Sequence, residues 1–150
     1  MAVKQFQQFL DDHQLKIKII ESDKPTRTAA EAAEVHQVPV SGIVKSILVN
    51  LDGKFILFLV PGDRKLDFGE LSHRYNAQLV RMATPDEVKK QTGYSIGGVP
   101  PFGHAHTLPV EIEDGFDPNG VVVPAAGAGN AVFKISFHQL QKILQELAVE

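Results

Sequence analysis

Lys45 is the first residue whose type and position indicate chemistry. If residues 43–49 form a strand, side chains two positions apart point to the same side, so Lys45 shares a face with Ile43, Ile47 and Val49. An ammonium group on an apolar face is costly unless it has a partner or opens into a cleft. Two interpretations follow. The side chain either reaches solvent from an edge strand, or it points into a pocket and holds a phosphate or a developing oxyanion.

A loop rich in glycine and proline is the second candidate, because residues 97–103 read Gly-Gly-Val-Pro-Pro-Phe-Gly. The glycines allow the backbone to approach a ligand closely, and the two prolines stiffen the loop. Such a loop can direct backbone N–H groups at a carbonyl oxygen, as an oxyanion site requires. A plain structural turn explains the same composition. The glycine spacing matches neither the phosphate-binding nor the dinucleotide-binding fingerprint.

Few other side chains are placed to support catalysis. The chain has no cysteine, which excludes thiol nucleophiles, disulfides and thiolate metal sites. His104 and His106 would share one face of a strand, but zinc sites need three or four ligands, so we predict no metal site. Ser41 and Ser46 have no histidine and carboxylate arranged around them as a catalytic triad requires. The chemistry is therefore expected from oxygen, nitrogen or backbone groups.

The rest of the sequence predicts the elements that position these residues. Helical spacing of apolar residues, with capping residues and a terminating glycine, predicts helices near residues 3–13, 29–35, 67–75, 84–93 and from 136 onward. Apolar alternation or short apolar runs predict strands at 15–20, 43–49, 55–60, 78–82, 108–112, 121–123 and 131–135. Gly53 can supply the positive φ of a hairpin turn between the second and third strands. We expect an α+β fold: a mixed, mostly antiparallel, curved or barrel-like sheet of six to seven strands with helices packed outside.

Length and charge limit the classes of protein to consider. A chain of 150 residues has the size of one domain, so residues 1–150 are expected to form a single domain. No apolar run approaches the roughly 20 residues of a membrane-spanning helix, and the start lacks a secretion signal, so we expect a cytoplasmic protein without a membrane partner. The net charge of −3 argues against a protein that coats nucleic acid, DNA included, but is compatible with a local basic patch.

Four segments, in their order and spacing, carry a resemblance to a known family. They are Val38 to Ser46 (VPVSGIVKS), Leu59 to Asp67 (LVPGDRKLD), Thr92-Gly93-Tyr94 leading into Gly97 to Gly103, and the glycine-containing turn near Gly127. From Pro25 to Leu140 the chain resembles the YbaK/ProX family of aminoacyl-tRNA editing domains, which includes the insertion domain of bacterial prolyl-tRNA synthetases. Two departures concern the choice of amino acid. Some cysteinyl-specific members carry an acidic residue where this chain has Val132, and some have threonine at the position of Ser46.

The resemblance implies the YbaK/ProRS-associated fold and a trans-editing hydrolase without a cofactor. Such an enzyme cleaves the ester between a wrong amino acid and the terminal adenosine of a tRNA, here alanyl- or cysteinyl-tRNA(Pro). A water molecule or the terminal ribose hydroxyl would attack. The implied partners are the aminoacyl-tRNA acceptor end and, as a candidate, prolyl-tRNA synthetase. The implied catalytic residues are Lys45, Gly97, Gly98 and Pro101, and the implied substrate-binding residues are Ser46, Val99, Pro100, Phe102, Gly103 and Gly127.

Two other functions stay open at this point. One is a non-catalytic module that binds a tRNA end or a nucleotide in association with a synthetase. The other is a small metal-dependent hydrolase that uses His104 and His106. For an enzyme that handles only the aminoacylated tip of tRNA, the net charge of −3 predicts weak tRNA affinity with a shallow salt dependence, or help from a partner synthetase.

Overall fold

A long hairpin forms the centre of the fold. The computed structural model describes residues 2–24 and 26–148, so Pro25, the first residue of the family resemblance, lies outside the described residues. Strand β2 (Val44–Leu51) pairs along its whole length with β3 (Lys54–Pro61). The turn consists of Asp52 and Gly53, whose φ angles are 52° and 90°, as a two-residue type I′ turn requires. The predicted hairpin and the conformation of Gly53 are confirmed.

The strands form more than one sheet. Strands β2 and β3 are the inner strands of a four-stranded sheet, with β4 (Val80–Met82) antiparallel to β2 and β5 (Val110–Ile112) parallel to β3. Two antiparallel pairs lie outside it: β1 (Ile20–Glu21) with β7 (Ala131–Val132), and β6 (Val121–Val122) with β8 (Ile135–Ser136). The α+β class and the mostly antiparallel pairing are confirmed. The predicted single curved or barrel-like sheet of six to seven strands is wrong, because the strands of the described residues form three separate sheets and no closed barrel.

Two predicted strands account for this division. The predicted strand at 131–135 is interrupted at Phe133, which is fully buried and whose amide donates to the Pro124 carbonyl at 3.1 Å, so β7 and β8 join different sheets. The predicted strand at 15–20 pairs only at its last residue. The amides of Leu15 and Ile17 make local hydrogen bonds, yet both side chains pack against the main core. The apolar alternation there indicates burial of one face and not strand pairing.

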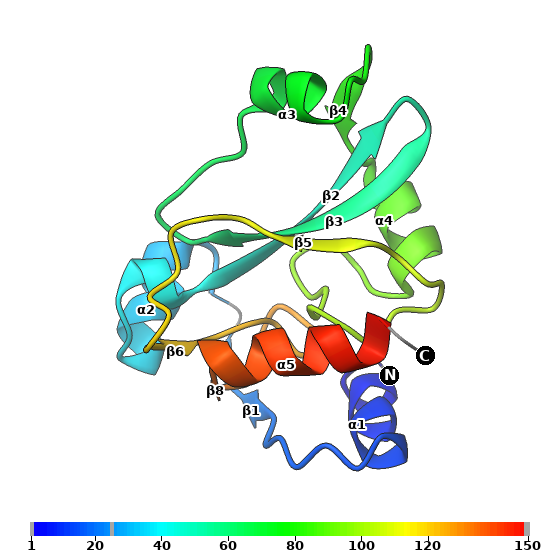
Figure 1. Cartoon of the computed structure of the whole chain (residues 1–150). Coiled ribbons are helices and arrows are strands. Elements are labelled where there is room, and N and C mark those ends of the chain that lie inside the picture. Colours follow the sequence, from blue (N-terminus) through cyan, green and yellow to red (C-terminus); the bar gives the residue numbers. More distant parts are fainter. Residues whose placement is uncertain (1, 25, 149–150) are drawn as a thin grey trace.

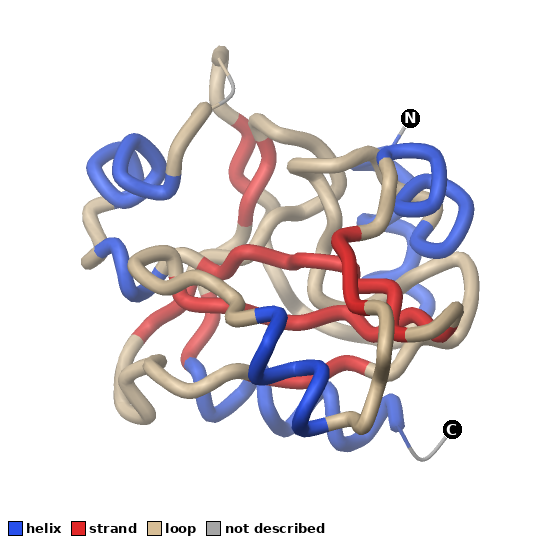
Figure 2. The backbone as a smooth tube through the Cα atoms, turned by 90° about the horizontal axis from the view of Figure 1, so that it is seen from above, coloured by secondary structure: helices blue, strands red, loops and turns tan. Residues whose placement is uncertain are grey.

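The helices form where the sequence predicts them. Thr28 and Thr84 each accept a hydrogen bond from the amide three residues later, and Gly93, with a φ of 83°, ends the fourth helix. Figure 1 shows α3 and β4 at one end of the molecule, and Figure 2 shows the helices around the periphery of the strands. The helices are α1 (Ala2–Asp12), α2 (Ala29–His36), α3 (Phe68–Arg74), α4 (Pro85–Thr92) and α5 (Phe137–Ala148), with a 3-10 turn at Val40–Gly42.

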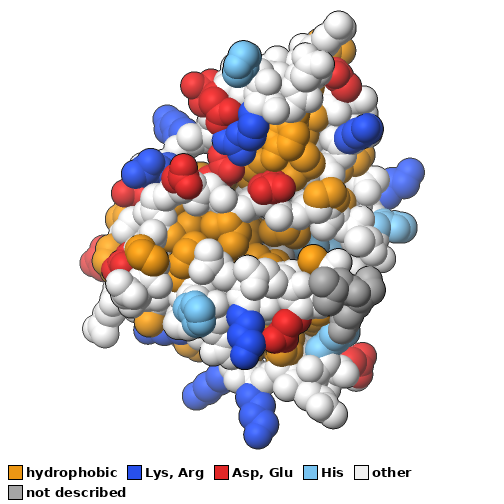
Figure 3. Space-filling view, in the orientation of Figure 1, with side chains coloured by type: hydrophobic (Ala, Val, Ile, Leu, Met, Phe, Trp, Pro, Cys, Tyr) orange, Lys and Arg blue, Asp and Glu red, His pale blue; other side chains and the backbone are white. Residues whose placement is uncertain are grey.

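The hairpin contributes to two apolar clusters because successive side chains of a strand point to opposite sides. The larger cluster contains Leu48 and Leu57 together with aromatic residues of α1, α5 and several loops, and the second contains Val49 and Phe58 beneath Leu71 of α3. On the face in Figure 3, hydrophobic side chains gather in the middle, between the α3 end and α5. A third, smaller cluster joins α2 to the start of β2 through Ala32, Ala33, Ile43 and Val123.

Among residues 2–24 and 26–148, none of the helices has both the length and the apolar character needed to span a membrane.

Candidate functional site

A pocket of about 280 Å³ lies where four segments of the chain meet. One is the start of α2 with the residues before it, and the second is the start of β2. The third is the loop at residues 97–99, and the fourth is the chain from Val123 to Val132. Small apolar side chains form much of the lining, and they include Ala29, Ala32, Ile43, Val123 and Val132. The candidate lysine and the candidate loop therefore border the same cavity.

Lys45 lines this pocket, and another loop holds its ammonium group. At Lys45, strand β2 is paired with β3 but not with β4, which pairs only with residues Val49 to Leu51 of β2. Lys45 Nζ donates a hydrogen bond to the carbonyl oxygen of Arg64 in the loop after β3. Burial, and then repulsion from Lys65, lower the pKa of Lys45 from its ordinary value, and the Asp63 carboxylate opposes this shift. The pocket therefore contains a partly desolvated cation.

Ser46, the next residue of β2, also lines the pocket. Its hydroxyl oxygen is buried and has no hydrogen-bond partner in the part of the chain that the structure describes. A buried hydroxyl without a partner carries a desolvation cost of about 1–3 kcal/mol. A polar group that enters the pocket within reach of Ser46 would remove this cost.

The glycine loop reaches the pocket through Gly97 and Val99. Its middle residue, Gly98, packs against the chain at 127–128. A Cβ atom on Gly98 would lie 2.7 Å from the Cα of Ala128, and the Gly127 amide donates to the Gly98 carbonyl at 2.9 Å. The two glycine-containing segments that the sequence singled out separately are therefore in direct contact.

Six of the ten predicted site residues do not line the pocket. Phe102 belongs to the main core, where its ring lies 5.6 Å from Phe6 and 6.0 Å from Phe133. Gly103 packs on the ring of Phe9. The residues that line the pocket are Lys45, Ser46, Gly97 and Val99, and those that do not are Gly98, Pro100, Pro101, Phe102, Gly103 and Gly127. We infer that these six hold the loop in place, since a loop packed on a rigid core keeps its backbone groups in one position.

His104 stabilises the same loop from its far end. Its Nε2–H donates to the carbonyl oxygen of Pro100 at 2.7 Å, a geometry that assigns the proton to Nε2 in the neutral ring. Burial lowers the pKa of His104, and the bond to Pro100 opposes this. His106 is exposed. The described residues contain no group of three or more His, Cys, Asp or Glu side chains that could hold a metal ion.

Replacing His104 with alanine is expected to lower the free energy of unfolding by about 1–3 kcal/mol, because the carbonyl of the buried Pro100 loses its donor. The measurement is urea-induced unfolding. His106→Ala is the matched control, since that side chain is exposed and two residues away. Equal stabilities of the two variants would show that the bond to Pro100 does not stabilise the loop.

The start of α2 is the part of the pocket that the sequence did not indicate. Thr26, Arg27 and Thr28 line the pocket just before and at the cap of α2, and Ala29 and Ala32 line it from the helix. The alanine-rich run predicts a helix but gives no sign of which of its faces meets the pocket. The one feature of the sequence that links this run to the pocket is its position shortly before Lys45 in the chain.

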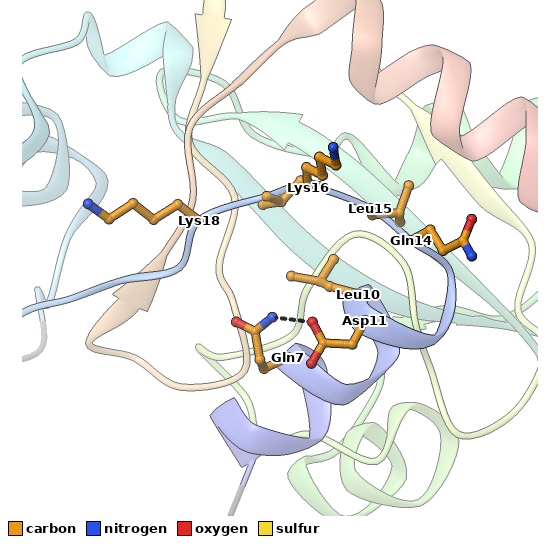
Figure 4. A pocket seen from close by; sticks show the side chains of 8 residues that line it. Gln7, Leu10, Asp11, Gln14, Leu15, Lys16 and Lys18 are labelled. Atoms are coloured by element: carbon orange, nitrogen blue, oxygen red, sulfur yellow. Dashed lines mark hydrogen bonds between the residues drawn. The ribbon is translucent and has the colours of Figure 1, made fainter.

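A larger and shallower groove lies elsewhere on the molecule. It has a volume of about 570 Å³ and lies between α1 and the segment that follows it, and Gln7, Leu10, Asp11, Gln14, Leu15, Lys16, Ile17 and Lys18 line it. Figure 4 shows Gln7 bonded to Asp11 within it and Lys18 pointing away from the helix. None of the predicted site residues borders this groove.

Known proteins are similar to this chain over most of its length. The family model described as an aminoacyl-tRNA editing domain matches residues 23–143. YwhH, a Bacillus subtilis protein of uncharacterized function, is 33% identical over 125 residues, which are 83% of this chain and 79% of YwhH. A solved structure described as a candidate trans-editing enzyme for prolyl tRNA synthetase is 34% identical, with a TM-score of 0.84 over 93% of this chain and 88% of that one.

Proline–tRNA ligases share a shorter region with this chain. The enzyme of Acidithiobacillus ferrooxidans is 39% identical over 84 residues, which are 56% of this chain and 15% of the ligase. The shared region is thus a small part of a much longer enzyme. The family model covers most of the chain, including all four segments that line the pocket. This chain therefore belongs to the family of aminoacyl-tRNA editing domains.

Proposed function

We propose that this protein is an aminoacyl-tRNA deacylase that acts in trans on mischarged tRNA, with alanyl- or cysteinyl-tRNA(Pro) as substrates. The observation that carries the proposal is the meeting of Lys45 with Gly97 and Val99 in one pocket. In this proposal the aminoacylated terminal adenosine binds between Lys45 and the Gly97–Pro101 loop. The tRNA acceptor end is the partner, and prolyl-tRNA synthetase is the candidate protein partner.

Hydrolysis of an aminoacyl ester needs orientation of the ester and stabilisation of an oxyanion more than a strong base. Gly97 and Val99 line the pocket and their amides have no acceptor among the described residues, whereas the Gly98 amide donates to the Ser95 carbonyl. In the proposed reaction, a water molecule attacks the carbonyl carbon and gives up a proton, because attack by the free ribose hydroxyl would only move the amino acid to the other ribose oxygen. Negative charge then develops on the carbonyl oxygen, near these amides and the Lys45 ammonium. When the ester bond breaks, the ribose oxygen takes up a proton.

The size and lining of the pocket support a small, uncharged amino acid side chain. A volume of about 280 Å³ is at or just below the small end of the usual range for ligand pockets, roughly 300–1,000 Å³. The lining includes the methyl groups of Ala29 and Ala32 from α2 and the side chains of Val123 and Val132. Such a pocket excludes large side chains by size but discriminates poorly between small ones, which is why alanine and cysteine are both proposed.

The direct test is deacylation of tRNA(Pro), tRNA(Ala) and tRNA(Cys), each charged with proline, alanine or cysteine. We expect hydrolysis of alanyl- or cysteinyl-tRNA(Pro) well above the spontaneous rate, and protection of prolyl-tRNA(Pro). Binding of uncharged tRNA without hydrolysis of any charged tRNA would instead support the non-catalytic module. Activity that is lost with a chelator and restored with a metal ion would support the metal-dependent hydrolase.

A further inference from the structure

The charges that line the pocket are all positive. Among its described lining residues, Arg27 and Lys45 are the charged ones, and no aspartate or glutamate is present. The Lys45 ammonium is bonded to the Arg64 carbonyl. The Arg27 guanidinium has no hydrogen-bond or ion-pair partner among residues 2–24 and 26–148, and the side chain is exposed. The pocket therefore has one cation held in place and a second one free to bind a ligand.

The surroundings of Arg27 keep it at the edge of the pocket. Its backbone amide donates to the Glu31 carboxylate at 3.1 Å, which fixes the chain just before the cap of α2. A Cβ atom on Gly62 would lie 3.0 Å from the Cβ of Ala29, so this end of α2 lies against the start of the loop that contains Arg64 and supports Lys45. The two cations thus belong to adjoining parts of the pocket.

The other charged groups near the pocket do not offer a free cation to a ligand in it. The Arg64 side chain lies against Gly115, where a Cβ atom would be 2.5 Å from its Nε. Lys65 lowers the pKa of Lys45 and Asp63 raises it, and neither of these two residues lines the pocket. The Glu31 carboxylate reaches the Arg27 amide but makes no hydrogen bond to the guanidinium. Arg27 is therefore the lining cation available to an anionic ligand.

We infer that Arg27 binds the phosphate that joins the terminal adenosine of the tRNA to the preceding nucleotide. This inference rests on the proposed function, because the ester end of the substrate must occupy the pocket beside Lys45. The phosphate is attached to the 5′ oxygen of the same nucleoside whose ribose carries the amino acid, so it is the first anionic group outside the pocket. A guanidinium can bind two phosphate oxygens at once, which suits it to this contact.

The experiment compares Arg27→Ala, Arg27→Lys and a control, Lys54→Ala, which removes an exposed cation at the first position of β3, beside the hairpin turn and outside the pocket. For alanyl-tRNA(Pro), we expect Arg27→Ala to raise KM about 10-fold with little change in kcat. The slope of log affinity against log salt should shrink by about 0.7, the value for one phosphate of a single strand. Arg27→Lys should restore that slope, and Lys54→Ala should change neither quantity.

A substrate without phosphate separates phosphate binding from catalysis. Hydrolysis of alanyl-adenosine, which carries the ester but no phosphate, should be the same for Arg27→Ala and the wild type. An equal loss on both substrates would place Arg27 at the ester and overturn the inference. Binding of adenosine monophosphate to Arg27→Ala and to the wild type is a further measurement. If Arg27→Ala weakens its binding but leaves alanyl-tRNA(Pro) kinetics unchanged, the site binds a free nucleotide and the inference is wrong.

Failure of the proposed function would be distinguishable from failure of this inference. If the wild type hydrolyses neither ester, the deacylase proposal fails. Binding of an uncharged RNA oligonucleotide that ends in CCA then tests Arg27 alone. Weaker binding by Arg27→Ala, with normal binding by Lys54→Ala, would support the phosphate contact. Equal binding by both variants would refute it.

Discussion

Replacing Lys45 with alanine is expected to lower kcat/KM for alanyl-tRNA(Pro) hydrolysis by a factor of about 100 to 1,000, the usual effect of removing one group that stabilises an oxyanion. The expected loss follows from the position and surroundings of the Lys45 ammonium. Lys45 is a cation in the pocket, it is partly desolvated, and the Arg64 carbonyl fixes its ammonium. The strand should stay folded, because β2 is held by its backbone pairing with β3. The measurement is steady-state deacylation, with circular dichroism to check the fold.

Lys65→Ala provides a matched control for Lys45→Ala. Lys65 is exposed and does not line the pocket, but it helps to lower the pKa of Lys45. Removing this neighbouring positive charge favours the charged form of Lys45, so the pKa of Lys45 should rise toward its ordinary value. Lys65→Ala should therefore retain activity and move the high-pH limb of its rate profile to higher pH. Full activity in Lys45→Ala would contradict the role of Lys45, whatever the behaviour of Lys65→Ala.

The sequence could single out Lys45 because a short-range rule identifies it. Strand alternation is enough to find a charge in an apolar stretch, and the hairpin around it follows from local turn chemistry at Asp52 and Gly53. The contact that holds its ammonium, the Arg64 carbonyl, is 19 residues away and depends on where the chain turns after β3. No periodicity of β2 contains that information.

For the loop at 97–103, in contrast, a short-range rule was not enough. Its composition predicted a shaped loop near a ligand, and Gly97 and Val99 do line the pocket. The composition could not distinguish residues that face the pocket from residues that support the loop. Phe102 is buried against Phe6 of α1, a contact that spans nearly a hundred residues of sequence. The three separate sheets were missed for the same reason, since strand pairing depends on long-range contacts that propensity does not specify.

Replacing Gly98 with alanine should have the second largest effect, because it separates two segments that form the pocket. The new methyl carbon would lie 2.7 Å from Ala128 Cα, 2.8 Å from Ala128 N and 3.0 Å from the Gly127 carbonyl carbon. All three are backbone atoms, so no side chain can rotate to make room. Overpacking of this kind costs about 1–3 kcal/mol. The loop at 97–99 and the chain at 127–128 must therefore move apart.

That movement should reduce activity as well as stability. Gly97 and Val99 line one side of the pocket, and Ala128 and Gly129 line it from the neighbouring segment. A displacement of about 1 Å at a catalytic site can lower the rate by about 100-fold. We expect Gly98→Ala to lower kcat/KM for alanyl-tRNA(Pro) by about that factor and to lower the midpoint of urea unfolding, both measured on the same preparation.

Gly120→Ala is the matched control for Gly98→Ala. Gly120 is also outside the positive-φ region, but its added methyl group would meet the exposed side chain of Asp117 at 3.1 Å, and it lies outside the pocket. A contact at 3.1 Å needs a smaller shift than the contact at 2.7 Å between Gly98 and Ala128, so Gly120→Ala should retain activity. If Gly98→Ala loses stability but keeps full activity, the loop moves without disturbing the ester, and the Gly97 and Val99 amides are not the oxyanion donors. If the two variants behave alike, the contact between Gly98 and Ala128 does not define the pocket.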